Sequence, residues 1–194
     1  MALLTALFAT ALLMGLGLSV LLLGSAETSL AARDRDSRAL GYAARAAASV
    51  TAADLRTLPT WAALTAPGAA PEVSATPGQL VDSTLTPPVP WGGGGVLDLR
   101  ALTARLQAES DAAASSGSAP PWRLFAFGPL SRLLPESAQP SPYYLVVWVA
   151  DEGGTIVARS AAYGPGDGRS ITEASLVRDP GTNLVRILTI RPGS

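Results

Sequence analysis

The N-terminal stretch from residue 1 to residue 26, MALLTALFATALLMGLGLSVLLLGSA, decides how the rest of the sequence is interpreted. It contains no charged side chain, and the first one follows at Glu27. As a helix it would be nearly 40 Å long at about 1.5 Å per residue, which exceeds the roughly 30 Å of a hydrocarbon core. Gly15 and Gly17 would weaken a water-exposed helix but are common in membrane helices. We therefore predict a single transmembrane helix over residues 1–26.

A cleaved signal peptide is the alternative interpretation of this stretch. Residues 24–26, Gly-Ser-Ala, form a tolerable cleavage site. However, no Lys or Arg precedes the apolar run, and the run is longer than the usual length of about 7–15 residues in a signal peptide. The sequence therefore favours the membrane anchor.

The helix is predicted to continue as a soluble half over residues 27–58. This range holds ten alanines among 32 residues, one glycine and no proline, and Ala is the best helix former. Asp34 and Arg38 stand four residues apart with the acid first, which is the stabilising order. The larger apolar residues spaced among the small ones are expected to let one face pack closely: Leu30, Leu40, Tyr42, Val50 and Leu58. Such a helix is longer than the domain it carries, so about half of it, the apolar half, is expected to project.

A connector and a short helix are predicted next. Residues 59–96 hold seven prolines and four consecutive glycines, which is typical of a loop-rich connector. Trp61 and Leu64 are the residues expected to dock it on the body. Asp98 is a good N-cap for a helix that runs to about Ala114, with leucines 99, 102 and 106 on one stripe.

The C-terminal third is predicted to form an antiparallel β-sheet, within a head domain that spans residues 97–194. Residues 143–150, YYLVVWVA, are a continuous apolar run rich in β-branched and aromatic residues, which is typical of a central strand buried on both faces. Four further strands are predicted at residues 122–127, 155–163, 169–178 and 183–191. The short connections are rich in Gly, Pro and Asp, which predicts a meander with a type II turn at residues 179–182. The fold class is therefore α+β, with a long transmembrane-plus-amphipathic N-terminal helix packed on the sheet.

The composition excludes most enzyme chemistry. The chain has no cysteine, histidine or lysine, so it has no thiol nucleophile, no imidazole base or metal ligand and no Schiff-base amine. Its net charge is −1 and it has no basic cluster, which argues against nucleic-acid binding. We expect a non-enzymatic protein without a cofactor or a metal.

Three short motifs have simpler structural interpretations. Residues 164–167, GPGD, match the GxGD signature of intramembrane aspartyl peptidases, but they stand between two predicted strands and are expected to form a turn. Residues 151–154, DEGG, are expected to form a hairpin turn rather than a cation site, because Ca²⁺ needs about six or more oxygen ligands. Asp34 and Asp36 alternate with arginines that hold both carboxylates ionised, so a surface segment is expected there and not a catalytic pair.

The residues that follow the apolar run resemble a known family. Residues 27–36, ETSLAARDRD, followed by residues 39–48, ALGYAARAAA, are similar to the N-terminal region of PilX-type minor pilins and type IV pilus assembly proteins. Glu27 lies on the family's acidic position, Arg35 and Asp36 on its Arg-Asp pair, and residues 43–44 on its Ala-Ala pair. The resemblance covers about the first 60 residues, and an apolar helix followed by an antiparallel sheet is the pilin-like architecture.

This resemblance implies a role and a set of interface residues. The role is a structural subunit in the assembly or initiation of a type IV pilus, a cell-surface fimbrium that serves in cell adhesion. The implied partners are other pilin subunits, which the N-terminal helix would contact, and the bacterial cytoplasmic membrane before assembly. The expected subunit-interface residues are Gly15, Gly17, Glu27, Arg33, Arg35 and Asp36. Glu27 would pair with a positive charge of a neighbouring subunit, or simply stand at the membrane boundary.

Two positions depart from the family pattern. Thr5 stands where major pilins carry Glu, if Met1 is counted as the first mature residue, and this favours a minor subunit. Arg45 replaces the acidic residue that follows the Ala-Ala pair. A minor pseudopilin of a type II secretion system and a secreted periplasmic β-domain that acts as a binding module are the alternatives.

Charge alone leaves the orientation in the membrane open. The arginines at positions 33, 35 and 38 would place the C-terminal domain in the cytoplasm by the positive-inside rule. A basic leader ahead of the apolar run, which prepilin processing requires, would restore the opposite orientation. We expect the C-terminal domain outside.

Overall fold

The computed structural model describes residues 2–58, 60–61, 89–90, 96–114, 119–133, 141–179 and 184–193. Leu64, the four glycines of the connector and most of the turn at residues 179–182 lie outside the described residues. The chain divides into two compact units, Met1–Arg38 and Ala39–Ser194.

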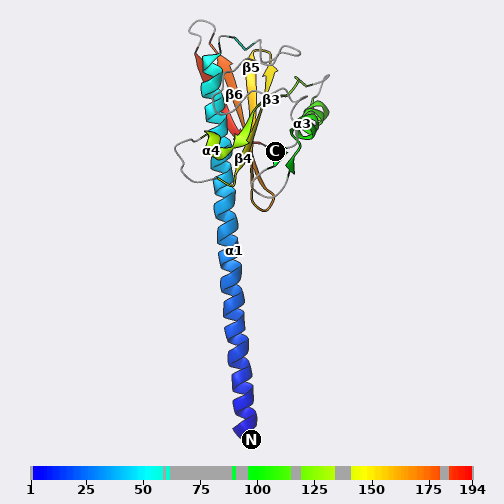
Figure 1. The fold of residues 1–194 in the computed structure, drawn as a ribbon. Coiled ribbons are helices and arrows are strands. Elements are labelled where there is room, and N and C mark those ends of the chain that lie inside the picture. The colour runs from blue at the N-terminus through cyan, green and yellow to red at the C-terminus, as the bar shows by residue number, and fades with distance from the viewer. Residues whose placement is uncertain are drawn as a thin grey trace. The chain divides into compact units, whose positions relative to one another are not determined.

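The first unit is helical throughout its described part. Helix α1 spans Ala2–Thr57 (Figure 1), so the uninterrupted helix predicted from residue 1 to about residue 58 is confirmed. The Asp34–Arg38 pair forms as expected, with 2.7 Å between the Oδ2 and Nη2 atoms. Both side chains are mostly exposed, so the pair adds only a few tenths of a kcal/mol to helix stability.

The second unit contains a five-stranded antiparallel sheet with the order β3-β4-β5-β6-β7. Its strands are β3 (Arg123–Pro129), β4 (Tyr144–Glu152), β5 (Thr155–Gly164), β6 (Gly168–Arg178) and β7 (Val185–Pro192). Every strand pairs with the next one along the chain, so the predicted meander is confirmed. The described smaller elements are β1 (Val89–Pro90), which pairs with β2 (Val96–Leu97), and the helices α3 (Leu99–Ala113) and α4 (Leu130–Leu133).

The turn chemistry of the two described hairpins explains why they form. In the β4–β5 hairpin the Gly154 amide donates to the Asp151 carboxylate at 2.7 Å, and Gly153 and Gly154 have positive φ angles of 66° and 96°. In the β5–β6 hairpin Gly166 and Asp167 also have positive φ angles, 65° and 60°. Both DEGG and GPGD therefore form hairpin turns, as predicted.

Helices cover both faces of the sheet (Figure 1). Along β4, Leu145, Val147 and Val149 belong to the core that contains residues of α1. The alternate residues Val146 and Trp148 belong to the core that contains residues of α3. The β4 run is thus buried on both faces, as its composition predicts.

Alanines form the packing face of α1, which corrects the expectation for its larger residues. The buried positions recur every three or four residues: Leu40, Ala43, Ala44, Ala47, Ala48, Thr51, Ala52 and Leu55. Among the five larger residues expected on this face only Leu40 is buried. Tyr42 is 68% exposed and Leu30, in the first unit, is 64% exposed. Alanine side chains let the helix axis approach the sheet closely, so the face needs few large residues.

Helix α3 begins and packs as predicted. The Asp98 carboxylate accepts a hydrogen bond from the Ala101 amide at 2.9 Å, which makes it the N-cap. Leu99 and Leu106 are buried against the sheet. The indole of Trp148 donates to the hydroxyl of Thr103 at 2.8 Å, which ties the helix to the centre of β4.

The C-terminal end of α1 is held by Trp61 and Arg178. The Trp61 indole donates to the Leu55 carbonyl at 3.1 Å, so the docking expected for Trp61 is confirmed. Arg178 donates to the carbonyls of Leu55 and Leu58 at 3.0 and 2.6 Å, and its guanidinium lies 5.0 Å from the centre of the Trp61 ring. A positive charge at this end is also favourable, because the C-terminal end of the helix dipole is negative.

Candidate functional site

The apolar part of α1 is the largest exposed apolar surface among the described residues. Side chains from Leu3 to Leu23 are more than half exposed, for example Leu13 at 69% and Leu22 at 64%. Monomeric soluble proteins rarely expose contiguous apolar patches of this kind, which mark contacts with other proteins or with a membrane. By length and composition α1 is the one described helix that could cross a membrane.

Hydroxyl groups within this part of α1 bond to the helix itself. Thr5 and Thr10 donate to the carbonyls of Ala2 and Leu7 at 2.8 and 2.9 Å. Ser19 donates to the carbonyl of Gly15 at 2.8 Å. Each of these donors is satisfied within the helix, so none of them needs water.

The predicted interface residues all lie on α1 within the first unit, but they do not share one side of it. Gly15 and Gly17 are two residues apart and therefore point about 160° away from each other. By the same rule Arg35 lies about 160° from Arg33, whereas Asp36, three residues after Arg33, lies only about 60° from it. The helix does not unite the six predicted residues into one site.

Small residues of α1 that are spaced by about seven positions do share one side of the helix. Gly24 is seven residues after Gly17, close to two turns, so both lie on the same side, and a Cβ added at either would meet no atom within 4 Å. Further small residues lie on the same side by the helical period, together with the larger Leu13, and we call this set of small residues the small-residue side: Ala6, Thr10, Gly17, Gly24 and Ala31. Arg35 continues it, whereas Gly15 lies opposite. Counting the sequence in steps of seven would have found Gly24.

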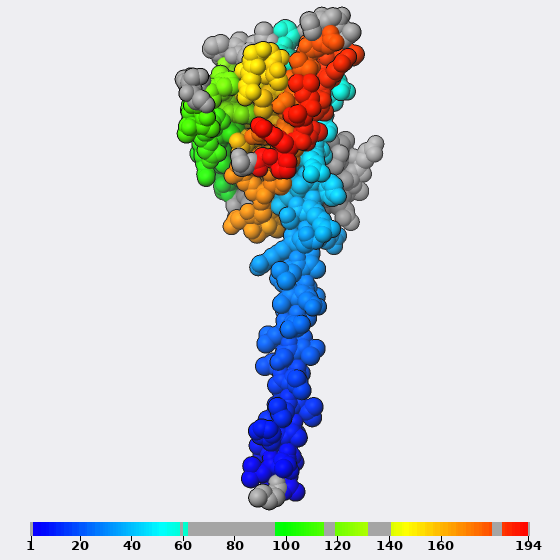
Figure 2. Space-filling model, turned by 180° about the vertical axis from the view of Figure 1, so that it is seen from behind, coloured from blue at the N-terminus to red at the C-terminus, as the bar shows by residue number. Residues whose placement is uncertain are grey.

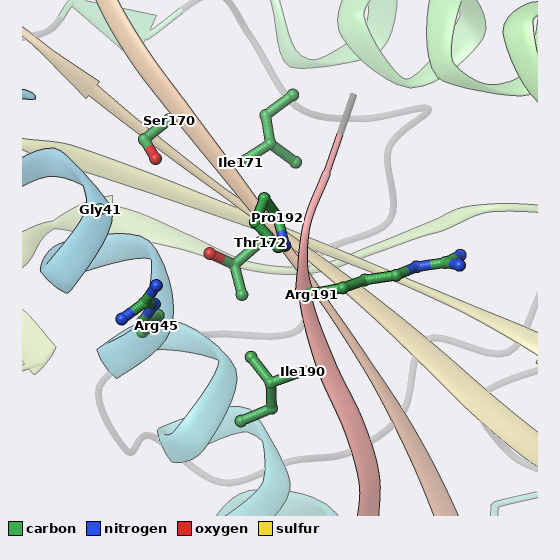
Figure 3. Close-up of a pocket in the computed structure, with 8 residues that line it drawn as sticks. All are labelled: Gly41, Arg45, Ser170, Ile171, Thr172, Ile190, Arg191 and Pro192. Atoms are coloured by element: carbon green, nitrogen blue, oxygen red, sulfur yellow. The ribbon is translucent and has the colours of Figure 1, made fainter.

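A groove with about 470 Å³ of space lies between α1 and strands β6 and β7 (Figure 3). Arg45, Thr172 and Ile190 lie around the gap between the helix and the strands, whereas the Arg191 side chain extends away from it. Arg191 instead pairs with Glu173 at 3.0 Å. The groove therefore presents one guanidinium beside a buried threonine and an apolar edge. Its lining combines charged, hydroxyl and apolar side chains.

Strand β7 forms an exposed edge of the sheet beside this groove (Figure 2). Its first residue, Val185, is buried and the rest are exposed. The pairing with β6 shifts at Leu188, and Arg186, Arg191 and Pro192 stand along the strand. A bulge, charges and a proline are features that discourage edge-to-edge pairing of sheets.

Among the described residues, the two side chains with raised pKa values are not brought together, and no metal-binding group is found. The described residues include no group of three or more acidic, histidine or cysteine residues placed to hold a metal ion. Burial raises the pKa of the Asp54 carboxyl, and burial also raises the pKa of the Tyr163 hydroxyl. Asp54 is on α1 and Tyr163 belongs to the core on the α3 face, so they do not form a catalytic pair.

Comparison of the chain with protein-family models, with curated proteins and with solved structures finds no match. The interpretation of its function therefore depends on the residues and on their geometry.

Proposed function

We propose that this chain is a non-enzymatic, single-pass membrane subunit of the minor type IV pilin-like kind, which takes part in the assembly or initiation of a pilus. The observation that carries the proposal is the exposed apolar part of α1, which continues without a break into the alanine face that packs on the sheet. Such a helix can be covered by lipid before assembly and by equivalent helices afterwards.

The small-residue side of α1 supports helix–helix contact as the mode of assembly. Helices in a membrane associate through van der Waals packing, and small residues let their backbones approach closely. Gly17 and Gly24 stand where a neighbouring helix would meet no Cβ. Glu27 follows the apolar run, where an ionisable group at the hydrocarbon boundary favours a charged partner.

The resemblance of residues 27–48 to PilX-type minor pilins is the reason for proposing this family. Glu27, the Arg35-Asp36 pair and the alanines at 43–44 stand in the order that PilX-type proteins share. In this structure Ala43 and Ala44 are fully or nearly fully buried in the α1 face. The proposed orientation places Ala39–Ser194 outside the cytoplasmic membrane, and the pilus or cell surface is the final location.

The intact mass of the protein from its native membranes, with fragmentation of the N-terminus, tests the class. An N-methylated residue at or near Met1 with the apolar helix retained is the expected result, since prepilin processing leaves that mark. A free amine at Glu27 would instead show a cleaved signal peptide and would replace this proposal with a secreted binding module. Loss of the gene should lower pilus number; a loss of type II secretion with normal pili would identify a pseudopilin.

Photo-crosslinking within α1 tests the helix contact. A photoreactive residue at position 17 or 24 should capture a protein that itself carries an apolar N-terminal helix. The same residue at position 15, on the opposite side of the helix, is the matched control and should capture much less. Equal capture from all three positions would contradict a contact through the small-residue side.

A further inference from the structure

A small pocket lies between α3 and the sheet, on the face opposite α1, and three arginines line it. Arg105 comes from α3, Arg159 from β5 and Arg169 from β6. Glu109 is the one acidic residue of the lining. The ionised side chains of the lining therefore carry three positive charges and one negative charge, a net charge of +2.

Each of the three guanidiniums contacts a different neighbour. Arg105 pairs with Glu109 at 2.9 Å between the Nε and Oε1 atoms. Arg169 lies over the ring of Tyr163, 5.9 Å from its centre. Arg159 lies 3.5 Å from a carboxylate oxygen of Glu173. Arg159 is thus held in a buried ion pair, whereas Arg105 and Arg169 reach the same pocket from exposed positions.

Arg159 is the buried member of the set. Its side chain is 8% exposed, and that of Glu173 is 14% exposed. Glu173 also binds Arg191 at 3.0 Å, so one carboxylate serves two guanidiniums. Transfer of a charge out of water is costly unless an opposite charge compensates it. Glu173 therefore compensates the buried charge of Arg159, and the guanidiniums of Arg105 and Arg169 add positive charge to the same pocket.

Tyr163 lines the pocket together with the three arginines. Burial raises the pKa of its hydroxyl, and Arg169, Arg159 and Arg105 each oppose that rise. The hydroxyl is neutral at pH 7, because a pKa above 10.0 leaves it protonated. Tyr163 thus adds no negative charge to the pocket.

We propose that this pocket binds a compact, singly charged anion between Arg105, Arg159 and Arg169. The space measures about 20 Å³, and a single water molecule needs about 10–15 Å³. Such a space admits a chloride ion or the oxygen end of a carboxylate and is too small for a sulfate or a phosphate. The two small anions share the chemistry that the pocket recognises, and the experiment distinguishes them.

Thermal unfolding of the full chain in detergent tests the proposal. Chloride, acetate and methanesulfonate are compared at constant ionic strength, with methanesulfonate as the reference because its tetrahedral sulfonate head is about as large as a sulfate. A ligand that binds only the folded state raises the melting temperature with its concentration. We expect a saturable rise of about 2–4 °C with chloride, with acetate or with both.

Variants separate binding in the pocket from general salt effects. Arg105→Gln and Arg169→Gln remove exposed guanidiniums from the lining and should shift the midpoint of the anion titration by at least tenfold. Arg56→Gln removes an exposed guanidinium outside the pocket and should leave the titration unchanged. Circular dichroism spectra that match the wild-type spectrum show that the variants are folded.

The outcomes distinguish the source of the anion. A response to chloride alone identifies an inorganic ion site, and a response to acetate identifies a site for a carboxylate. No anion-specific rise in the wild-type protein would overturn the proposal. An equal rise in wild type, Arg105→Gln and Arg169→Gln would overturn it as well, and neither result bears on the assembly of α1.

Discussion

Leu40 packs against two glycines, Gly164 at the end of β5 and Gly168 at the start of β6. A Cβ on Gly164 would lie 2.9 Å from Leu40 Cδ2, and a Cβ on Gly168 would lie 2.8 Å from Leu40 Cδ1. Real Cβ atoms essentially never approach another heavy atom so closely. The first glycine of the GPGD motif therefore serves packing, which explains its presence without a catalytic role.

We predict that Gly164→Ala destabilises the protein by about 1–3 kcal/mol, because both Leu40 and the Tyr143 ring, whose Cδ1 would also lie 2.9 Å from the new Cβ, must shift to admit the methyl group. Chemical denaturation measures the free energy of unfolding. Gly41→Ala is the matched control: its Cβ would meet only Ser170 Oγ at 3.9 Å, and Ala in a helix is favoured over Gly by up to about 1 kcal/mol. In a double-mutant cycle with Leu40→Ala, additive losses would contradict the packing contact.

Asp54 is an unfavourable carboxylate in the last turn of α1. Burial raises the pKa of its carboxyl, and a negative charge near a helix C-terminus opposes the dipole. We predict that Asp54→Asn raises the melting temperature at pH 7. The advantage should shrink as the pH falls through the raised pKa and vanish below about 3.8, because the wild-type carboxyl is then protonated in both states. The exposed Glu152→Gln variant is the control; a pH-independent gain would contradict this interpretation.

Helix α1 packs on the sheet through alanines, so its buried positions have little room for larger side chains. Ala44 and Ala48 are completely buried, whereas Ala53 on the same helix is exposed. We predict that Ala48→Leu costs about 1–3 kcal/mol because the added carbons force the helix away from the sheet. Ala53→Leu makes the same chemical change on the exposed side and should stay within about 0.5 kcal/mol. Equal effects in denaturant titrations would show that the face is loosely packed.

Periodicity and turn chemistry allowed the elements themselves to be predicted. Each of the five strands lies within two residues of its predicted bounds, and Asp98 caps α3 as its residue type suggests. The bulge in β3 had no signal in the sequence: the pairing with β4 shifts between Leu124 and Ala126, which places Phe125 and Ala126 in the same core. Tyr42 is expected on the packing face because of its size, but it is exposed because the buried positions follow the spacing of the alanines.

At the scale of the whole molecule, three environments follow one another along a single helix. Residues 2–26 are apolar and exposed, residues 27–38 are polar and exposed, and the buried positions begin at Leu40. The candidate site was only partly predictable on this scale. The apolar run and Glu27 could be read directly, and the small-residue side follows from the seven-residue spacing once the segment is known to be helical. The arginine pocket could not be predicted, because its side chains come from three separate elements.

Hydrogen exchange in lipid nanodiscs should resolve these three environments. We predict slow exchange for amides 6–26, where the bilayer excludes water, and slow exchange for amides 40–55, where the helix packs on the sheet. Amides 29–38 should exchange faster than both, because they have neither protection. Peptides from β4 provide the slow reference within the same sample. Fast exchange throughout residues 6–26 would contradict membrane insertion of the helix.

During synthesis the alanine face of α1 is made well before the strands that it packs on. The face ends at Leu55, but β4, which supplies the middle of its core, begins only at Tyr144. At roughly 5–20 residues per second, a ribosome needs on the order of 5–20 s to make the intervening chain. The meander then pairs neighbouring strands over short distances, which is fast. The nascent helix must therefore remain soluble without its sheet. A face made of alanines exposes less apolar surface than one made of leucines and is less prone to aggregate during that interval.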